Sequence, residues 1–206
     1  MKINKKWTSI IESIIVLLIV VMWIVWTYTI FTSSQKLSNT TQNRLEAIQI
    51  AREWLEAISN IRDTNWLMFS ANYKNCFMTL NYDARCITAD DSDIWSIVIG
   101  PWSYIIYQDS DNRWRVESKT WWSWFDYDYR DNFLVFVDNN WFYTQSWSTL
   151  DTSPLFTREL IINPDTSDTP PQKYEIESIV RWVDSSRSDY HQVKLNMTLT
   201  NWKNKQ

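Results

Sequence analysis

The sequence predicts an α+β protein in which a long N-terminal helix, apolar in its first half, packs its second half against an antiparallel β-sheet. Three observations predict this fold class. Residues 10–30 are almost entirely apolar, residues 44–66 carry apolar side chains at helical spacing, and the chain from about residue 66 onward contains short β-rich runs separated by Asp, Asn, Ser and Pro. The length of 206 residues suffices for one anchor segment and one domain with a single core.

The apolar run follows a short basic head with three lysines, and only Glu12, Ser13, Thr27 and Thr29 interrupt it. A run of about 21 residues is long enough to span a bilayer as a helix. Because cytoplasmic flanks are rich in lysine and arginine, the basic head predicts that the N-terminus lies in the cytoplasm and the rest of the chain outside. The polar residues that follow the run lack the small-residue site at which secretory signals are cut, so an ordinary signal peptide is not predicted.

Beyond the apolar run, residues 33–43 are polar and either break the helix or form an exposed part of it. Apolar residues then return at intervals of three or four, which predicts a helix with one apolar face. This face is predicted to contain Leu45, Ile48, Leu55, Ile58 and Ile61. A solvated face is predicted to contain Arg52, Glu53 and Glu56.

The rest of the chain contains β-rich runs and no helix between them, which predicts an antiparallel sheet. Alternation is clearest near the C-terminus, where Val193, Leu195, Met197 and Leu199 fall on one face and Lys194, Asn196, Thr198 and Thr200 on the other. Residues 163–173 are predicted to form a loop. The β-rich runs are DIWSIVIG, YIIYQD, NFLVFVD, FYTQS, PLFTRELIIN, KYEIESIVRWVD and YHQVKLNMTLTNW.

Composition argues against several classes of function. The net charge is −4 and no basic face is evident, so nucleic acid is not a predicted partner. With His191 as the one histidine, and without a nucleophile–base pair, a phosphate loop or a carboxylate pair, we predict no enzyme and no cofactor.

Cys76 and Cys86 lack further ligands at metal-binding spacing, so they are expected to form a disulfide in a domain outside the cytoplasm, with no metal site. The acidic stretches at residues 89–93 and 109–112 are expected to be solvated turns rather than calcium loops.

The chain has 15 tryptophans and 1 glycine. Average usage of about 7% glycine would give roughly 14 in this length. Tryptophan stands where turns favour glycine, as at Trp102 after Pro101 and at Trp141 after Asn140. The pattern indicates that about twelve tryptophans are UGA codons that the host reads as glycine, which some uncultivated bacterial lineages do. The alternative is a truly tryptophan-rich protein that exposes aromatic platforms to carbohydrates.

The recoding interpretation makes a structural prediction. Seven suspect tryptophans are expected in loops or turns and mostly exposed: Trp102, Trp114, Trp121, Trp122, Trp124, Trp141 and Trp147. Three that we expect to be genuine should be more buried, in or beside regular elements: Trp66, Trp182 and Trp202. The same interpretation places glycine at positions 7 and 54.

With glycine at position 7, the stretch KKWTSIIESIIVLLIV at residues 5–20 resembles the N-terminal segment of type IV prepilins and type II secretion pseudopilins. In that family a basic leader ends in glycine, and a membrane peptidase cuts after it and methylates the new amino terminus. The resemblance implies cleavage between Trp7 and Thr8, which makes Glu12 the fifth mature residue, where the family carries glutamate. Thr8 departs from the phenylalanine that is frequent at the first mature position.

The resemblance implies a pilin-like fold with four parts. Residues 1–7 would be the leader, 8–31 the transmembrane and assembly helix, 32–65 its amphipathic continuation, and 66–206 an extracytoplasmic β-rich domain. Residues 51–66 and the closing strands also look like pilin-like proteins of small-genome uncultivated bacteria, although this second likeness is less specific.

The function implied is that of a structural subunit of a type IV pilus or a pseudopilus. Implied partners are prepilin peptidase, other pilin subunits and the pilus assembly platform in the cytoplasmic membrane, from which the subunit would pass to the cell surface. A carboxylate at membrane depth costs about 2.5–3.5 kcal/mol on insertion scales, and in the filament Glu12 would meet the terminal amine of a neighbour. Two alternatives stay open: a Glu12 that merely reaches the interface, and an uncleaved membrane-anchored surface protein with aromatic carbohydrate-binding platforms.

Overall fold

The computed structural model describes residues 5–90, 92–119, 133–137, 143–145, 155–183 and 190–202. The side chains of residues 5–9 and 190 lie outside this description. The chain divides into two compact units, residues 1–44 and residues 45–206. Five of the suspect tryptophans lie outside the described residues: Trp121, Trp122, Trp124, Trp141 and Trp147.

Helix α1 (Lys5–Met68) is continuous through the polar stretch at residues 33–43. Hydroxyl side chains in and before this stretch donate to carbonyls of the preceding turn. Thr29 Oγ1 donates to the Trp26 carbonyl oxygen at 2.7 Å, and Thr41 Oγ1 donates to the Leu37 carbonyl oxygen at 2.8 Å. Such bonds satisfy the hydroxyl groups inside the helix itself. The polar stretch is therefore an exposed part of one helix, which settles the alternative that the sequence left open.

The second half of α1 buries one stripe of side chains, and the predicted apolar face is only partly right. Ile58 and Ile61 are buried as predicted, whereas Leu45 is 58% exposed. The buried stripe is centred on Trp54, whose side chain is fully buried. The buried face of the helix is therefore rotated about the helix axis from the face that the sequence predicted. The buried residues of the stripe are Ala47, Ile50, Ala51, Trp54, Ala57, Ile58, Ile61, Asn65 and Trp66.

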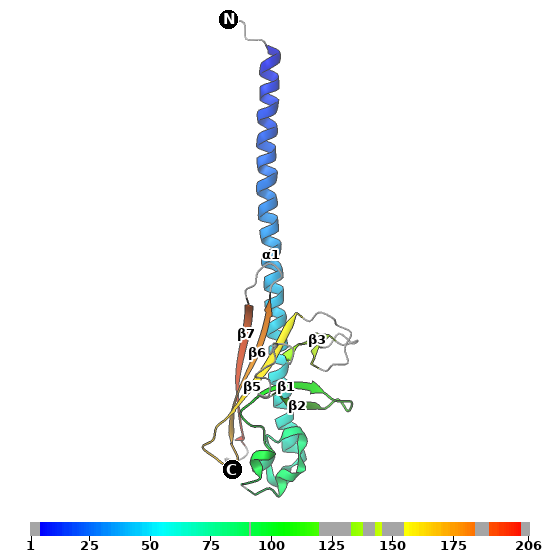
Figure 1. Ribbon diagram of the computed structural model, residues 1–206, viewed down its shortest axis with the longest axis vertical. Coiled ribbons are helices and arrows are strands. Elements are labelled where there is room, and N and C mark those ends of the chain that lie inside the picture. Colours follow the sequence, from blue (N-terminus) through cyan, green and yellow to red (C-terminus); the bar gives the residue numbers. More distant parts are fainter. Residues whose placement is uncertain are drawn as a thin grey trace, which may run out of the picture. The chain divides into compact units, whose positions relative to one another are not determined.

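A five-stranded antiparallel sheet lies against this part of α1, which confirms the predicted α+β class (Figure 1). Its strand order is β2-β1-β5-β6-β7, and every neighbouring pair is antiparallel. A separate two-stranded pair joins β3 to β4. The strands are β1 (Ser103–Gln108), β2 (Trp114–Ser118), β3 (Phe136–Val137), β4 (Tyr143–Thr144), β5 (Phe156–Pro164), β6 (Lys173–Val183) and β7 (Tyr190–Thr200).

The core forms where the buried stripe of α1 meets the inner face of β5 and β6. Trp54, Ile58 and Ile61 share one cluster with Leu160, Ile162, Tyr174 and Ile176. In β7 the predicted alternation is confirmed, since the residues from Lys194 to Thr200 are exposed at every second position. Residues 165–172 connect β5 to β6, in agreement with the predicted loop.

A charged side chain, that of Arg158, lies inside this core. Arg158 on β5 is 1% exposed, and its Nη1 atom lies 3.0 Å from Glu53 Oε2 and its Cζ atom 4.0 Å from the centre of the Trp54 ring. Burial lowers the pKa of Arg158 to about 10, and the Glu53 carboxylate opposes this shift. Glu53, expected on the solvated face with Arg52 and Glu56, therefore connects the helix to the sheet instead.

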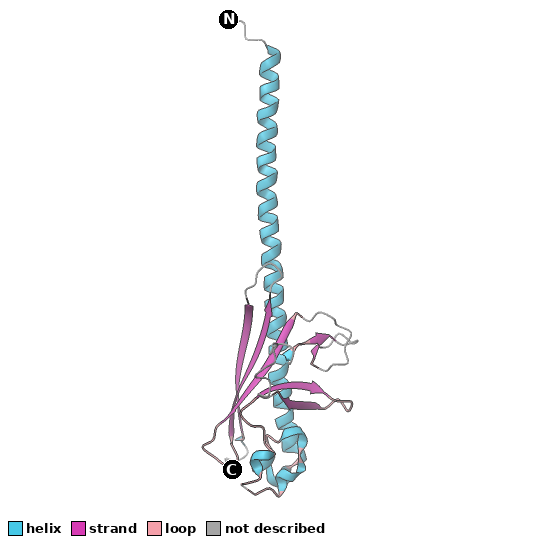
Figure 2. Cartoon of the chain, in the orientation of Figure 1, coloured by secondary structure: helices cyan, strands magenta, loops and turns pink. Residues whose placement is uncertain are grey.

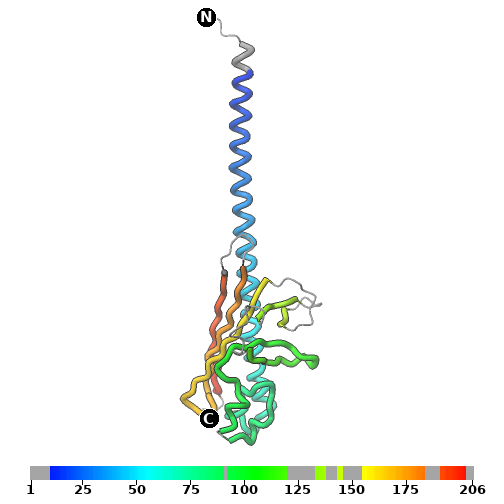
Figure 3. The backbone as a smooth tube through the Cα atoms, in the orientation of Figure 1, coloured from blue at the N-terminus to red at the C-terminus, as the bar shows by residue number. Residues whose placement is uncertain are grey.

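Between α1 and β1 the chain forms short helical turns (Figures 2 and 3). They are η1 (Ser70–Asn72), α2 (Tyr73–Cys76), η2 (Leu80–Tyr82), η3 (Ala84–Ile87) and η4 (Ile94–Ser96). The predicted β-run at residues 93–100 is wrong, because only Val98 makes a bridge there, to Thr79. Ile94, Ile97 and Val98 are spaced as on a helical turn, and all three are buried.

The described tryptophans agree with the recoding prediction only in part. Trp102 lies exposed in a bend, and Trp66 and Trp182 are buried, all as predicted. Trp114 was expected in a turn, but it opens β2 and is half-buried because β2 pairs with β1 from that residue onward. Trp202 was expected to be buried and is 57% exposed, because it follows the last residue of β7 at the margin of the sheet.

Candidate functional site

The first unit presents a helix whose apolar side chains are exposed. From Ile10 to Phe31 the large hydrophobic residues of α1 are all exposed. Within the described residues, α1 is the one helix that is long and apolar enough to cross a membrane, judged by length and composition. At about 1.5 Å per residue, the 22 positions from Ile10 to Phe31 extend about 33 Å, which is close to the thickness of a hydrocarbon core.

Glu12 is the only charged residue between Trp7 and Gln35. Its side chain is exposed, two residues from the start of the described apolar segment. On the helix surface its nearest neighbours one turn on are Ile15 and Val16, both exposed and apolar. The carboxylate therefore lies at the start of the exposed apolar segment, with apolar neighbours on its C-terminal side.

Trp7 and Thr8, the residues on either side of the proposed cut, lie in α1. Their side chains lie outside the described residues. The structure thus places their backbone in a helix with Glu12 one turn further along, and it says nothing about their contacts.

Other polar groups in the apolar segment find partners within the helix. Thr27 Oγ1 donates to the carbonyl oxygens of Trp23 at 3.0 Å and Ile24 at 2.9 Å. Backbone and hydroxyl groups that are satisfied inside the helix carry little cost in lipid. Glu12 differs from them, because a carboxylate in an apolar environment needs a cation or water as its partner, and the helix backbone supplies neither.

In the second unit, a disulfide joins Cys76 and Cys86, with the two Cα atoms 5.2 Å apart. Both cysteines are fully buried beside Phe69, Ile94 and Ile97. The bond closes the loop of short helical turns that follows α1. Among the described residues no group of three or more His, Cys, Asp or Glu side chains could hold a metal ion.

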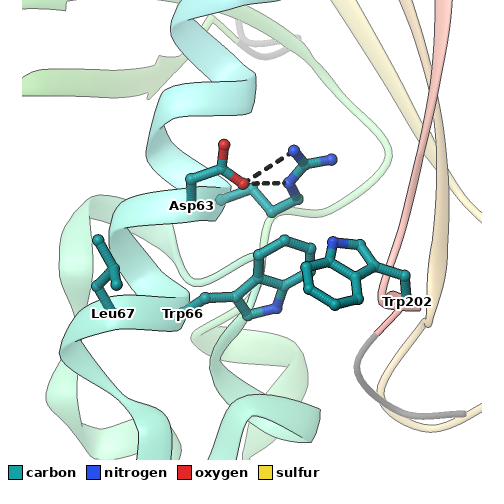
Figure 4. A pocket seen from close by; sticks show the side chains of 5 residues that line it. Asp63, Trp66, Leu67 and Trp202 are labelled. Atoms are coloured by element: carbon teal, nitrogen blue, oxygen red, sulfur yellow. Dashed lines mark hydrogen bonds and ion pairs between the residues drawn. The ribbon is translucent and has the colours of Figure 1, made fainter.

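A small pocket opens where the end of α1 meets the end of β7 (Figure 4). We call it the corner pocket; its volume is about 440 Å³, and Arg62, Asp63, Trp66, Leu67 and Trp202 line it. The Trp66 and Trp202 rings meet edge to face, with centroids 5.1 Å apart and planes at 83°. The Arg62 guanidinium lies 4.8 Å from the centre of the Trp66 ring.

Sequence analysis did not single out Arg62 and Asp63, and it expected Trp202 to be more buried, in or beside a regular element. The sequence could have predicted the contact between Arg62 and Trp66. These residues are four positions apart, so they are neighbours on the surface of a helix. The approach of Trp202 to Trp66 depends on where β7 ends in the sheet, which no local pattern specifies.

No protein-family model, curated protein or solved structure matches this chain.

Proposed function

We propose that this protein is a structural subunit of a type IV pilus or pseudopilus, cut between Trp7 and Thr8 and polymerised through α1. The observation that carries the proposal is that the two halves of α1 differ in what their apolar side chains contact. Up to Phe31 it exposes apolar side chains, and from Ala47 onward it buries one stripe against the domain. An exposed apolar helix that is anchored by a folded domain is suited first to a bilayer and then to packing against copies of itself.

The isolated carboxylate supports the same proposal. Among the residues whose side chains the structure describes, the next cation after Glu12 in sequence is Lys36, whereas cleavage before Thr8 would create a new amine four residues before Glu12. In a bundle of parallel helices shifted along their axes, Glu12 of one subunit meets the amine of the next. The pairing compensates two charges that are costly in an apolar environment, and it sets the axial register.

The position of the aromatic residues also supports membrane residence before assembly. Tyr28 and Phe31 lie at the end of the apolar segment, beside the polar stretch that begins at Thr32. Tyrosine and tryptophan concentrate at the boundary between lipid and water, and Tyr28 fits this position. The membrane-spanning form would hold the N-terminus in the cytoplasm and residues 45–206 outside.

Replacing Glu12 tests the polymerisation step. In Glu12→Ala, membrane insertion should be unchanged or improved, because a polar group leaves the apolar segment. The yield of sheared filaments should fall about tenfold or more, because the terminal amine of the neighbouring subunit loses its partner. Immunoblots of membrane and sheared fractions measure both quantities.

Ser13→Ala is the matched control, since it removes a polar group from the adjacent position on a different side of the helix. It should leave the filament yield unchanged. Filaments of Glu12→Ala at the parental yield would show that the carboxylate does not set the register.

A further inference from the structure

The corner pocket has one rigid aromatic wall and one exposed one. Trp66 is 4% exposed and packs on Phe77, with ring centroids 6.4 Å apart and planes inclined by 23°. Trp202 is held at right angles to it and keeps more than half of its surface in contact with solvent. Because Trp66 is packed in the core, this wall of the pocket is in place before any ligand arrives.

The polar groups of the pocket offer hydrogen bonds without a net charge. Arg62 Nη2 and Nε lie 2.8 Å and 2.9 Å from the same oxygen, Asp63 Oδ1. Within the described residues Asp63 Oδ2 accepts no hydrogen bond, and the Asp63 side chain is 54% exposed. An open carboxylate oxygen therefore lies beside the aromatic corner, while the guanidinium compensates its charge (Figure 4).

This combination selects among ligand classes. An anion would meet Asp63 and a cation would meet Arg62, so neither sign is favoured over the other. A purely apolar group would cover the Asp63 carboxylate without supplying a donor, which carries a desolvation cost. A pyranose ring satisfies both parts of the pocket, because its C–H face can stack on the exposed indole of Trp202 and its hydroxyl groups can donate to Asp63 Oδ2.

We propose that the corner pocket binds a neutral glycan, with Trp202 as the stacking platform and Asp63 as the hydrogen-bond acceptor. The pocket is open to solvent, so it accepts one or two sugar rings of a longer chain. All of its residues belong to the second unit, and binding does not depend on cleavage at Thr8 or on polymerisation.

The test measures binding of neutral hexasaccharides to the full chain in a detergent that contains no sugar. Isothermal titration calorimetry is performed with cellohexaose, hexa-N-acetylchitohexaose, xylohexaose and maltohexaose, and with a hexamer of galacturonic acid as the charged comparison. At least one neutral probe should bind. Trp202→Ala should weaken that binding about tenfold or more, and Asp63→Ala should weaken it severalfold, because each removes one of the two contacts.

Trp102→Ala is the matched control, because Trp102 is 47% exposed in a bend outside the pocket. It should bind as the parent does, and Trp202→Tyr should retain most of the affinity because it keeps an aromatic face. Circular dichroism confirms that each variant is folded. The proposal is overturned if no neutral probe binds, if only the galacturonic acid hexamer binds, or if Trp202→Ala and Trp102→Ala weaken binding equally.

Discussion

At the scale of single residues, Trp54 holds the core together. Its ring is fully buried between α1 and β5, and the Arg158 guanidinium lies over it at 4.0 Å. A cation over the face of an indole is stabilised by the ring quadrupole, and more strongly when both are removed from water. The recoding interpretation, which places glycine at position 54, would leave a cavity there and a buried cation without its aromatic neighbour.

Replacing Trp54 by glycine therefore tests the interpretation at this position. We expect Trp54→Gly to lose about 4 kcal/mol or more of unfolding free energy, from ~3–5 kcal/mol for the deleted ring and about 1 kcal/mol for glycine in a helix. Urea unfolding of the full chain in detergent, followed by near-ultraviolet circular dichroism, measures the change.

Ala57→Gly, one turn further along the same buried stripe, serves as the control for helix propensity and should cost about 1 kcal/mol. If Trp54→Gly were as stable as the parent or more stable, glycine would be the residue for which this core is built.

The tryptophans show what residue patterns can and cannot predict. Burial of Trp66 and Trp182 was predicted because both were interpreted as genuine tryptophans in or beside regular elements, and both are buried. The predicted apolar face of the helix left out Trp54, which was interpreted as glycine, and it also left out Ile50 and the alanines that share the buried stripe. Positive φ angles in the described residues occur at Asn81, Tyr82 and Asn112, and at no tryptophan, so the described turns do not need glycine at the suspect positions.

At the scale of elements, the two edges of the sheet differ in whether another part of the chain covers them. On β2 the Asn81 side chain pairs with the strand as a backbone would. Asn81 Nδ2 donates to the Val116 carbonyl oxygen at 3.1 Å, and the Val116 N–H donates to Asn81 Oδ1 at 2.9 Å. Covering an edge in this way prevents further strands from pairing there. On β7, by contrast, no described strand pairs with the outer edge.

Removing the Asn81 amide should expose β2 at Val116. Asn81 has a φ of 53°, so Asn81→Gly deletes the side chain without adding backbone strain. We expect a loss of about 1–3 kcal/mol, because two buried backbone groups lose their partner, and faster hydrogen exchange at the Val116 amide.

Hydrogen exchange read by mass spectrometry measures the change at β2. Asn163→Ala, at an exposed position of β5, should leave that exchange unaltered. Unchanged protection of Val116 in Asn81→Gly would show that Asn81 does not cover the edge.

Six of the strands were predicted from β-rich runs, and β2 was missed. Residues 114–118 contain a tryptophan, an arginine and a glutamate between polar turns, so the local pattern is weak. The pairing of β2 with β1 and the bonds from Asn81 stabilise it, and these contacts come from elsewhere in the chain. At residues 93–100 a strand was predicted where the structure has a helical turn. A short run of apolar residues is compatible with either element, and only contacts from elsewhere in the chain decide between them.

At the scale of the whole molecule, the sequence predicts an anchor helix that continues into a β-domain, and the structure has one helix over Lys5–Met68 that exposes apolar side chains in its first half and packs on the sheet in its second. The length and the apolar character of the first half are local properties, which is why they could be predicted. The corner pocket could not be predicted, because it depends on the meeting of the end of α1 with the end of β7, which are far apart in the sequence. Leader cleavage and polymerisation remain a proposal supported by Glu12 and by the register of the leader.

Intact mass spectrometry of the protein purified from the membranes of its native host tests this proposal most directly. We predict that the principal species begins at Thr8, carries one methyl group on its terminal amine and lacks the three leader lysines. Fragment masses from the same sample also show which tryptophan positions carry glycine. A chain that begins at Met1 as the only species would contradict the assignment and would favour the uncleaved, membrane-anchored surface protein.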